Sequence, residues 1–191
     1  MIVNVPNLIT LSRIILIPLL IGLYYLPDSW LLEHTRNVAA TAVFIFAGIT
    51  DWLDGYLARR LNQMSAFGAF LDPVADKLIV VGALVVLLYL NRVDMLVALI
   101  IIGREIAISA LREWMARVGQ AKSVAVAFIG KLKTVSQMVA IPLLLYHDPL
   151  LELVDCQWLG TILINIAAVL TVVSMLYYLR KALPHASHRA G

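Results

Sequence analysis

Four aspartates with helical spacing are the residues of this sequence best suited to chemistry, and they lie between two uncharged runs. They are Asp51, Asp54, Asp72 and Asp76. Each residue of a helix turns by ~100°, so the first two acids share one helix face and the last two share another. The connection between the two helices is short, which makes them antiparallel neighbours whose acidic faces can meet. The sequence therefore predicts one cluster of four carboxylates.

The uncharged runs place this cluster within the edge of a membrane. Residues 38–50 and 78–90 are 13 residues each. Such a run makes about 20 Å of helix, less than the ~30 Å of hydrocarbon in a bilayer. The helices can cross only if the aspartates themselves lie just inside the bilayer edge. Carboxylates in that position are costly unless they are paired or bind a cation, and they are functional by default.

The charge and ligand type of the cluster point to metal ions. Four carboxylates carry about −4 in total, which two divalent cations balance and one does not. Oxygen ligands of this kind suit Mg²⁺ or Mn²⁺ and disfavour zinc or copper. Two such ions a few ångströms apart stabilise both the attacking and the leaving oxygen at a phosphorus centre. Gly55, Ala58 and Gly68 leave space beside the acids, and Arg59 offers a planar fork suited to phosphate.

The composition predicts the fold class. The chain has 191 residues, of which 62% are hydrophobic and 14% charged, whereas a soluble domain is nearer one half apolar and one quarter charged. We expect an all-α polytopic membrane protein, because apolar runs recur along the chain without the strand-length alternation of an outer-membrane barrel. Six transmembrane helices are expected, at residues 7–26, 37–60, 70–91, 94–117, 131–147 and 157–180. They form one domain, residues 1–182, followed by a short cytoplasmic tail, residues 183–191.

The distribution of Lys and Arg predicts the orientation. Basic residues crowd the side that carries the aspartates, and the opposite side carries only Arg36 and Arg92. The positive-inside rule then puts both termini and the site on the cytoplasmic side of the inner membrane. The first apolar segment lacks a small-residue cleavage site and contains Arg13, so we expect a retained span rather than a signal peptide. A single cysteine, Cys156, allows no intrachain disulfide.

The aspartates belong to a longer pattern, D-x-x-D-G-x-x-A-R, eight residues, then G-x-x-x-D-x-x-x-D. Every position is filled, by Asp51, Asp54, Gly55, Ala58, Arg59, Gly68, Asp72 and Asp76. The pattern resembles the signature of the CDP-alcohol phosphotransferase family, whose members have six transmembrane helices and usually form homodimers.

The resemblance assigns roles to these residues. It implies that Asp51, Asp54 and Asp72 bind two divalent cations, Mg²⁺ or Mn²⁺, and that Asp76 holds the second cation and acts as the catalytic base. It also implies a site for CDP-diacylglycerol made by Asp51, Asp54, Gly55, Ala58, Arg59, Gly68 and Asp72.

Residues 4–18 and 103–134 resemble, more narrowly, the bacterial members of this family that use sn-glycerol 3-phosphate as acceptor. This resemblance implies transfer of the phosphatidyl group of CDP-diacylglycerol, a membrane lipid, to that acceptor with release of CMP. An acceptor that carries its own phosphate needs cations near the metals. The candidates are Arg13, Arg104, Arg112, Lys131 and Lys133. Glu105 and Arg112 are seven residues apart and can pair on one helix face.

Two alternatives remain. The same chemistry could use inositol phosphate, or serine or another uncharged alcohol; the basic residues argue against an uncharged acceptor but do not separate two phosphorylated ones. The acids could instead line a divalent-cation transporter. That function leaves the Gly-x-x-Ala-Arg segment without a role, and the sequence has no internal repeat of the kind common in transporters. No nucleic-acid partner is expected.

Overall fold

The computed structural model describes residues 5–60, 66–117, 128–150 and 153–187. Within these ranges the regular secondary structure is helical, apart from an isolated bridge between Leu150 and Val154, and turns connect the helices. The elements are α1 (Val5–Gly22), the 3₁₀ turn η1 (Leu23–Tyr25), α2 (Glu33–Arg60), α3 (Ala66–Tyr89), α4 (Met95–Arg117), α5 (Phe128–Tyr146) and α6 (Cys156–Ser187).

The structure confirms an all-helical chain with six α-helices in its described part, in the expected order. Several bounds differ from those predicted. α2 begins at Glu33 and α3 at Ala66, each earlier than expected, and α6 continues to Ser187, past residue 180. The prediction followed the apolar runs, whereas a helix can continue into polar residues at its ends, where an acid such as Glu33 stabilises the first turn.

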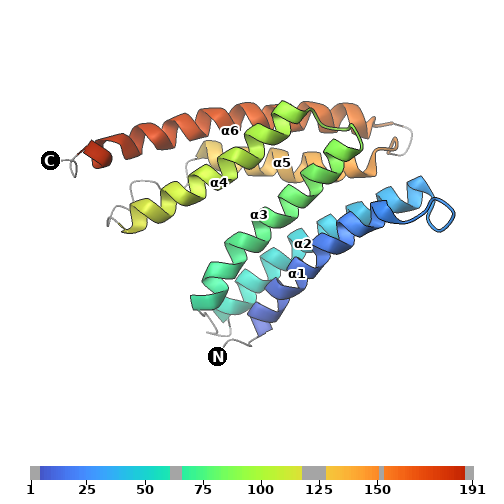
Figure 1. The fold of residues 1–191 in the computed structure, drawn as a ribbon, viewed down its shortest axis with the longest axis horizontal. Helices are drawn as coiled ribbons and strands as arrows, with labels where there is room; N and C mark the ends of the chain where they lie inside the picture. The colour runs from blue at the N-terminus through green and yellow to red at the C-terminus, as the bar shows by residue number, and fades with distance from the viewer. Residues whose placement is uncertain (1–4, 61–65, 118–127, 151–152, 188–191) are drawn as a thin grey trace.

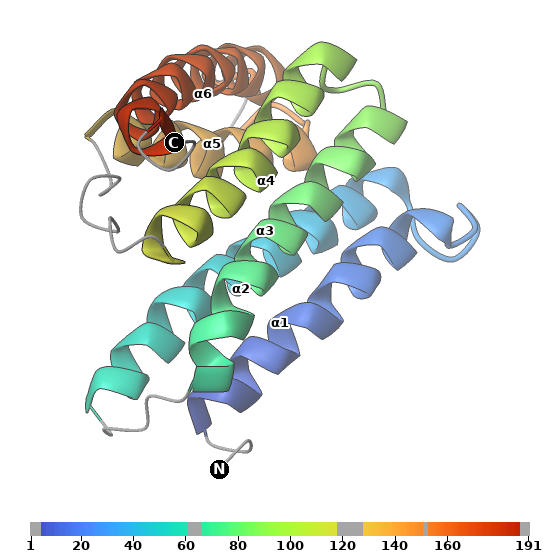
Figure 2. The same ribbon diagram turned by 60° about the vertical axis from the view of Figure 1, so that its left-hand side comes forward.

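The six helices form two groups that pack along their length (Figure 1). α1, α2 and α3 pack against one another, and α5 and α4 both pack against α6. The groups meet through contacts of α2 with α5 and of α3 with α4 and α5. Figure 2 shows the first residues of α1, the end of α2 and the start of α3 at the same end of the molecule. The ends of α2 and α3 that carry the aspartates therefore lie at one end of the molecule.

The core lies where the two groups meet and uses small residues for close approach. Ala40 and Ala47 of α2 and Ala83 of α3 are fully or almost fully buried in it. Gly160 of α6 faces α5 so closely that an added Cβ would lie 2.7 Å from Cγ of Leu144. Small residues of this kind let helices pack tightly where no large side chain fits.

At the other end of the molecule a buried arginine, Arg92, connects two elements. α3 ends at Tyr89. Two residues later Asn91 adopts a left-handed conformation with φ 55°, and the N–H of Arg92 donates to the carbonyl of Leu87 at 2.9 Å. The Arg92 side chain donates to the carbonyls of Leu144 and Leu145, at 3.2 and 2.9 Å. It is 6% exposed. Arg92 thus caps the end of α5 and joins it to the turn after α3.

Two described stretches are long and apolar enough to cross a membrane, Leu8–Tyr25 and Cys156–Arg180, with mean hydropathies of 1.9 and 2.3. The other four α-helices carry charged residues within their length, including the aspartates of α2 and α3. Large apolar side chains also cover outward faces, among them Ile15, Phe46, Leu99 and Val169. Contiguous apolar surface on a soluble monomer is unusual, so this exterior fits a lipid environment.

Candidate active site

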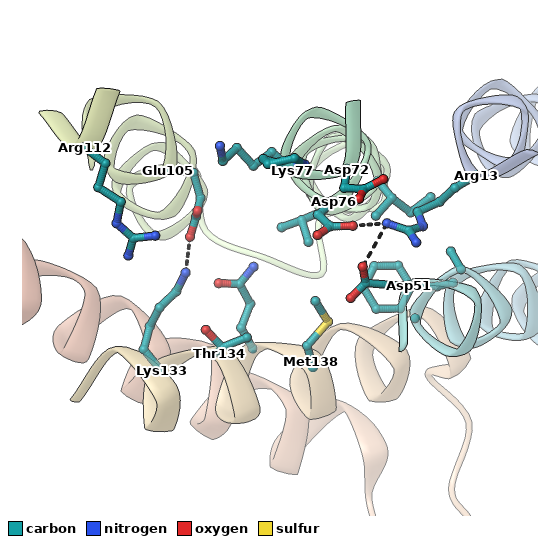
Figure 3. Close-up of a pocket in the computed structure, with 17 residues that line it drawn as sticks. Arg13, Asp51, Asp72, Asp76, Lys77, Glu105, Arg112, Lys133, Thr134 and Met138 are labelled. Atoms are coloured by element: carbon teal, nitrogen blue, oxygen red, sulfur yellow. Dashed lines mark hydrogen bonds and ion pairs between the residues drawn. The ribbon is translucent and has the colours of Figure 1, made fainter. Parts of the chain in front are cut away.

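Arg13 of α1 lies among the aspartates and holds three of them. Its Nη1 donates to Asp51 at 3.1 Å and to Asp76, and its Nη2 donates to Asp54 at 2.7 Å. The arginine is fully buried. Figure 3 shows the guanidinium between the carboxylates of α2 and α3. One cation from α1 therefore joins the acidic faces of both neighbouring helices.

Thr10 completes this arrangement one turn earlier on α1. Its hydroxyl is within hydrogen-bonding distance of Asp54, at 3.1 Å, and of Asp72, at 2.6 Å. Thr10 and Arg13 are three residues apart, so they share one face of the helix. Side chains of α1 thereby contact all four aspartates. The structure brings together the four acids that the helical spacing grouped.

The acids differ in depth. Asp54 is 2% exposed as a residue, whereas the side chains of Asp51 and Asp76 are 48% and 39% exposed. Asp54 therefore anchors the cluster in the interior, while Asp51 and Asp76 face the space that a substrate can enter.

The chemistry of these side chains fits divalent cations. Among the described side chains, no three acidic, His or Cys groups converge as metal ligands do, and Arg13 and Thr10 contact the carboxylate oxygens. The candidate metal ligands are nevertheless all carboxylates. They come as i,i+3 and i,i+4 pairs from the adjacent helices α2 and α3, and they already surround the positive charge of Arg13. Hard dications prefer oxygen ligands of this kind.

The other residues of the motif lie on the same helix ends. Gly55, Ala58 and Arg59 belong to the last turns of α2, but their side chains fall outside the described residues. Gly68 is buried near the start of α3. A nucleotide site beside the acids and the contacts of Arg59 both stay predictions.

A second charged cluster lies on α4, α5 and α6. Glu105 and Lys133 form an ion pair in which the side chains are 18% and 4% exposed. Arg104 donates to Ser174 at 3.2 Å and lies 3.5 Å from Glu105. The sequence allowed Glu105 to pair with Arg112, and the structure gives it Lys133 and Arg104 as partners.

Tyr178 of α6 orders the two arginines of this cluster. The guanidinium carbon of Arg104 lies 5.9 Å from the centre of its ring, and that of Arg112 lies 5.6 Å from it. Cation–π contacts of this length are favourable, more so where water is excluded. Tyr178 therefore keeps two like charges close together beside Glu105.

One cavity of about 370 Å³ connects the two clusters. Its acidic end is lined by Arg13, Asp51, Asp72 and Asp76, and its basic end by Glu105, Arg112 and Lys133. Figure 3 shows the two sets on opposite sides, with α5 running beneath both. The cavity can hold a molecule that presents a reacting group to the acids and a negative charge to the basic end.

The five basic candidates differ in their relation to this cavity. Arg112 and Lys133 line its basic end, whereas Arg13 lines the acidic end. Arg104 is buried behind the lining, and Lys131 is exposed on another face of α5. Lys77, one residue after Asp76, also lines the cavity. The sequence analysis did not single out Lys77 or Thr10, although Thr10 stands at i−3 from an arginine within an apolar run.

Comparison with known proteins defines the class to which this fold and site belong. Residues 3–173 match the CDP-alcohol phosphatidyltransferase family, and the chain belongs to that family. This confirms the relationship that the aspartate pattern indicated. Its curated relatives include the CDP-diacylglycerol–glycerol-3-phosphate 3-phosphatidyltransferases of Escherichia coli strain K12, Shigella flexneri and Salmonella choleraesuis strain SC-B67. Each is 49% identical to this chain over 181 residues, which cover 94% of both proteins.

Proposed function

We propose that this protein transfers the phosphatidyl group of CDP-diacylglycerol to sn-glycerol 3-phosphate, forming phosphatidylglycerophosphate and CMP. The observation that carries the proposal is 49% identity, over 94% of the chain, to enzymes named for this reaction. The cavity supports it independently, because acids suited to metal-assisted phosphoryl chemistry and cations suited to an acceptor phosphate line opposite ends of one space.

Asp51, Asp54, Asp72 and Asp76 would hold two divalent cations, Mg²⁺ or Mn²⁺. When bound, these cations stabilise negative charge that develops on the oxygens around the phosphorus. Gly55, Ala58, Arg59 and Gly68 would bind the cytidine diphosphate portion of the donor beside them. The acyl chains of the donor would remain in the lipid that surrounds the helices.

Asp76 accepts the proton of the attacking hydroxyl in this mechanism. The freed oxygen forms a bond to the phosphorus that bears diacylglycerol, and the bond from that phosphorus to CMP breaks. Asp76 suits this role because its half-exposed carboxylate lines the cavity, whereas Asp54 is buried. Proton transfer by a positioned side chain contributes about 10²–10⁴-fold to a rate.

Arg112 and Lys133 bind the acceptor phosphate, since both line the basic end of the cavity. Arg104 supports them from behind, through Glu105 and Tyr178. For Arg13 we propose a role other than acceptor binding, the role that the sequence suggested. Its three carboxylate partners favour a positioning residue for the acids.

The protein works in the cytoplasmic membrane with this cavity open to the cytoplasm, where a charged acceptor is found. Support comes from the apolar exterior and from the basic residues at the end of the molecule that carries the site, against Arg36 and Arg92 at the other. Six spans and a homodimeric assembly complete the proposal, as the family resemblance implies.

The test is transfer by the purified protein in detergent micelles. With CDP-diacylglycerol and Mg²⁺ we expect sn-glycerol 3-phosphate to give a lipid product of the mass of phosphatidylglycerophosphate, together with equimolar CMP. Serine and inositol 1-phosphate should give little product, and EDTA should abolish the reaction. Preferential transfer to either of those acceptors would identify another member of the family. Cation uptake by liposomes without CMP release would favour the transporter.

A further inference from the structure

Gln137 on α5 has a buried polar atom without a partner. The residue is 3% exposed, and its Oε1 has no hydrogen bond among the residues that the structure describes. Leaving a buried acceptor unpaired costs roughly 1–3 kcal/mol, so such an atom calls for an explanation. Gln137 lines the cavity of the candidate active site, and a bound molecule can therefore supply the missing donor.

Gln137 lies on α5 between the two ends of the cavity. Lys133, one turn earlier, pairs with Glu105 at the basic end. Met138, the next residue, lies on the side of Asp51 (Figure 3). Gln137 therefore lines the cavity between the phosphate-binding cations and the acids.

The proposed acceptor, sn-glycerol 3-phosphate, has one polar group between its two ends, at the position that corresponds to Gln137. sn-Glycerol 3-phosphate carries its phosphate on one end carbon, the attacking hydroxyl on the other and a second hydroxyl between them. With the phosphate on Arg112 and Lys133 and the attacking hydroxyl at Asp76, the middle hydroxyl lies over the centre of α5. A hydroxyl donates a hydrogen bond, and an amide oxygen accepts one.

We propose that Gln137 is a specificity-determining residue whose Oε1 accepts a hydrogen bond from the middle hydroxyl of the acceptor. The proposal rests on the proposed function, because it needs an acceptor with a phosphate at one end. It explains how the site distinguishes a glycerol phosphate from a phosphorylated chain of the same length without that hydroxyl.

The test compares sn-glycerol 3-phosphate with 3-hydroxypropyl phosphate, which has the same chain and phosphate but lacks the middle hydroxyl. In the wild-type protein we expect kcat/KM to favour sn-glycerol 3-phosphate by about tenfold or more, the effect of one good hydrogen bond. Gln137→Met, which matches the shape and removes the acceptor oxygen, should abolish this preference by lowering kcat/KM for sn-glycerol 3-phosphate alone. The KM for CDP-diacylglycerol should stay within about twofold of the wild-type value.

Two further variants separate recognition from packing. Gln137→Glu keeps an oxygen that can accept the hydrogen bond. The preference for sn-glycerol 3-phosphate should therefore persist, even if the negative charge weakens the binding of both phosphorylated acceptors. Thr134→Val is the matched control on the same lining, because the Thr134 hydroxyl already donates to the carbonyl of Gly130 at 2.9 Å, and it should retain the preference.

Four outcomes would overturn the inference. A preference that survives in Gln137→Met shows that another group recognises the middle hydroxyl of sn-glycerol 3-phosphate. An equal loss for both acceptors shows that Gln137 acts on the phosphate or on the fold. A wild-type protein that uses both acceptors equally well lacks the discrimination altogether, although the proposed function then stands. Failure of the wild-type protein to use either acceptor defeats the proposed function itself and this inference with it.

Discussion

At the scale of single residues, Arg13 makes the largest contribution to the electrostatics of the site. A fully buried guanidinium contacts three carboxylates, one of which is itself buried. Removing one partner from a buried ionic group typically costs about 3–5 kcal/mol, because the remaining charges are left uncompensated. Divalent cations placed among the same acids would supply the same compensation. The contribution of Arg13 to stability should therefore depend on metal.

Arg13→Met tests this dependence through stability rather than turnover. We expect the variant to unfold at a much lower temperature than wild type in EDTA, and to recover part of that loss in Mn²⁺. The gain in Tm on adding Mn²⁺ should exceed the wild-type gain by on the order of 5 °C. Thermal unfolding in detergent micelles measures both.

Arg36→Met is the control for Arg13→Met, because Arg36 pairs with Asp28 outside the acid cluster, at 2.9 Å. Its effect should be the same with and without Mn²⁺. An equal loss of stability for Arg13→Met under both conditions would mean that Arg13 and the cations do not compensate the same charges.

Asp76→Asn tests whether Asp76 is the catalytic base. An amide of the same shape cannot accept the hydroxyl proton, so we expect kcat to fall by at least about 100-fold. The variant should still insert into the membrane and purify as a folded protein. CMP release measures the rate, and substantial residual turnover would remove Asp76 from the role of base.

At the level of elements, α5 presents different functions on different faces. Lys133 lines the cavity, whereas Lys131, two residues earlier, is exposed. Lys133→Gln should raise the KM for sn-glycerol 3-phosphate by about tenfold or more, since it removes a charged contact to the phosphate, and should change the KM for CDP-diacylglycerol less.

Lys131→Gln is the matched control for Lys133→Gln and should change either KM by less than about twofold. Because Lys133→Gln removes one of the two partners of Glu105, the double variant Lys133→Gln, Glu105→Gln checks that the effect is not one of folding. A larger rise in the donor KM than in the acceptor KM would place Lys133 on the nucleotide.

Arg92 joins elements at the opposite end. Its side chain caps α5 through two carbonyls and also reaches Asn37, at 3.2 Å, and Glu33, at 3.3 Å, both on α2. Arg92→Gln should lower stability by about 2–4 kcal/mol, because the buried carbonyls lose a charged donor. Activity per folded molecule should stay unchanged. The exposed Arg180 offers the control Arg180→Gln, and equal melting temperatures for the two variants would contradict the capping role.

The same elements show what the sequence could and could not predict. The grouping of Asp51 with Asp54 and of Asp72 with Asp76 follows from helical spacing alone, so the acid cluster was predictable. The partners of Arg13 and Glu105 were not, because they depend on how α1 packs on α2 and α3 and how α4 and α5 both pack on α6. Spacing within a helix allowed Glu105 and Arg112 to pair, yet Lys133 from another helix reaches the same acid.

For the whole molecule, the position of the cavity matters most. The proposed reaction joins a donor held in lipid to an acceptor dissolved in water, so the site must be reachable from both. The cavity lies between the two helix groups, and its aspartates stand near the helix ends at one side of the molecule. This arrangement requires that the end of the molecule with the aspartates face the compartment that holds the acceptor.

Labelling of introduced cysteines tests that orientation. Ala116 is exposed near the end of α4 on the side of the site, and Leu153, 86% exposed, lies in the turn before α6 at the opposite end. In a Cys156→Ser background, a membrane-impermeant maleimide should label Leu153→Cys in spheroplasts with an intact inner membrane. It should reach Ala116→Cys only in inside-out vesicles. The reverse pattern would put the acids and Lys133 outside the cytoplasm, where a cytoplasmic phosphate ester could not enter the cavity without crossing the bilayer.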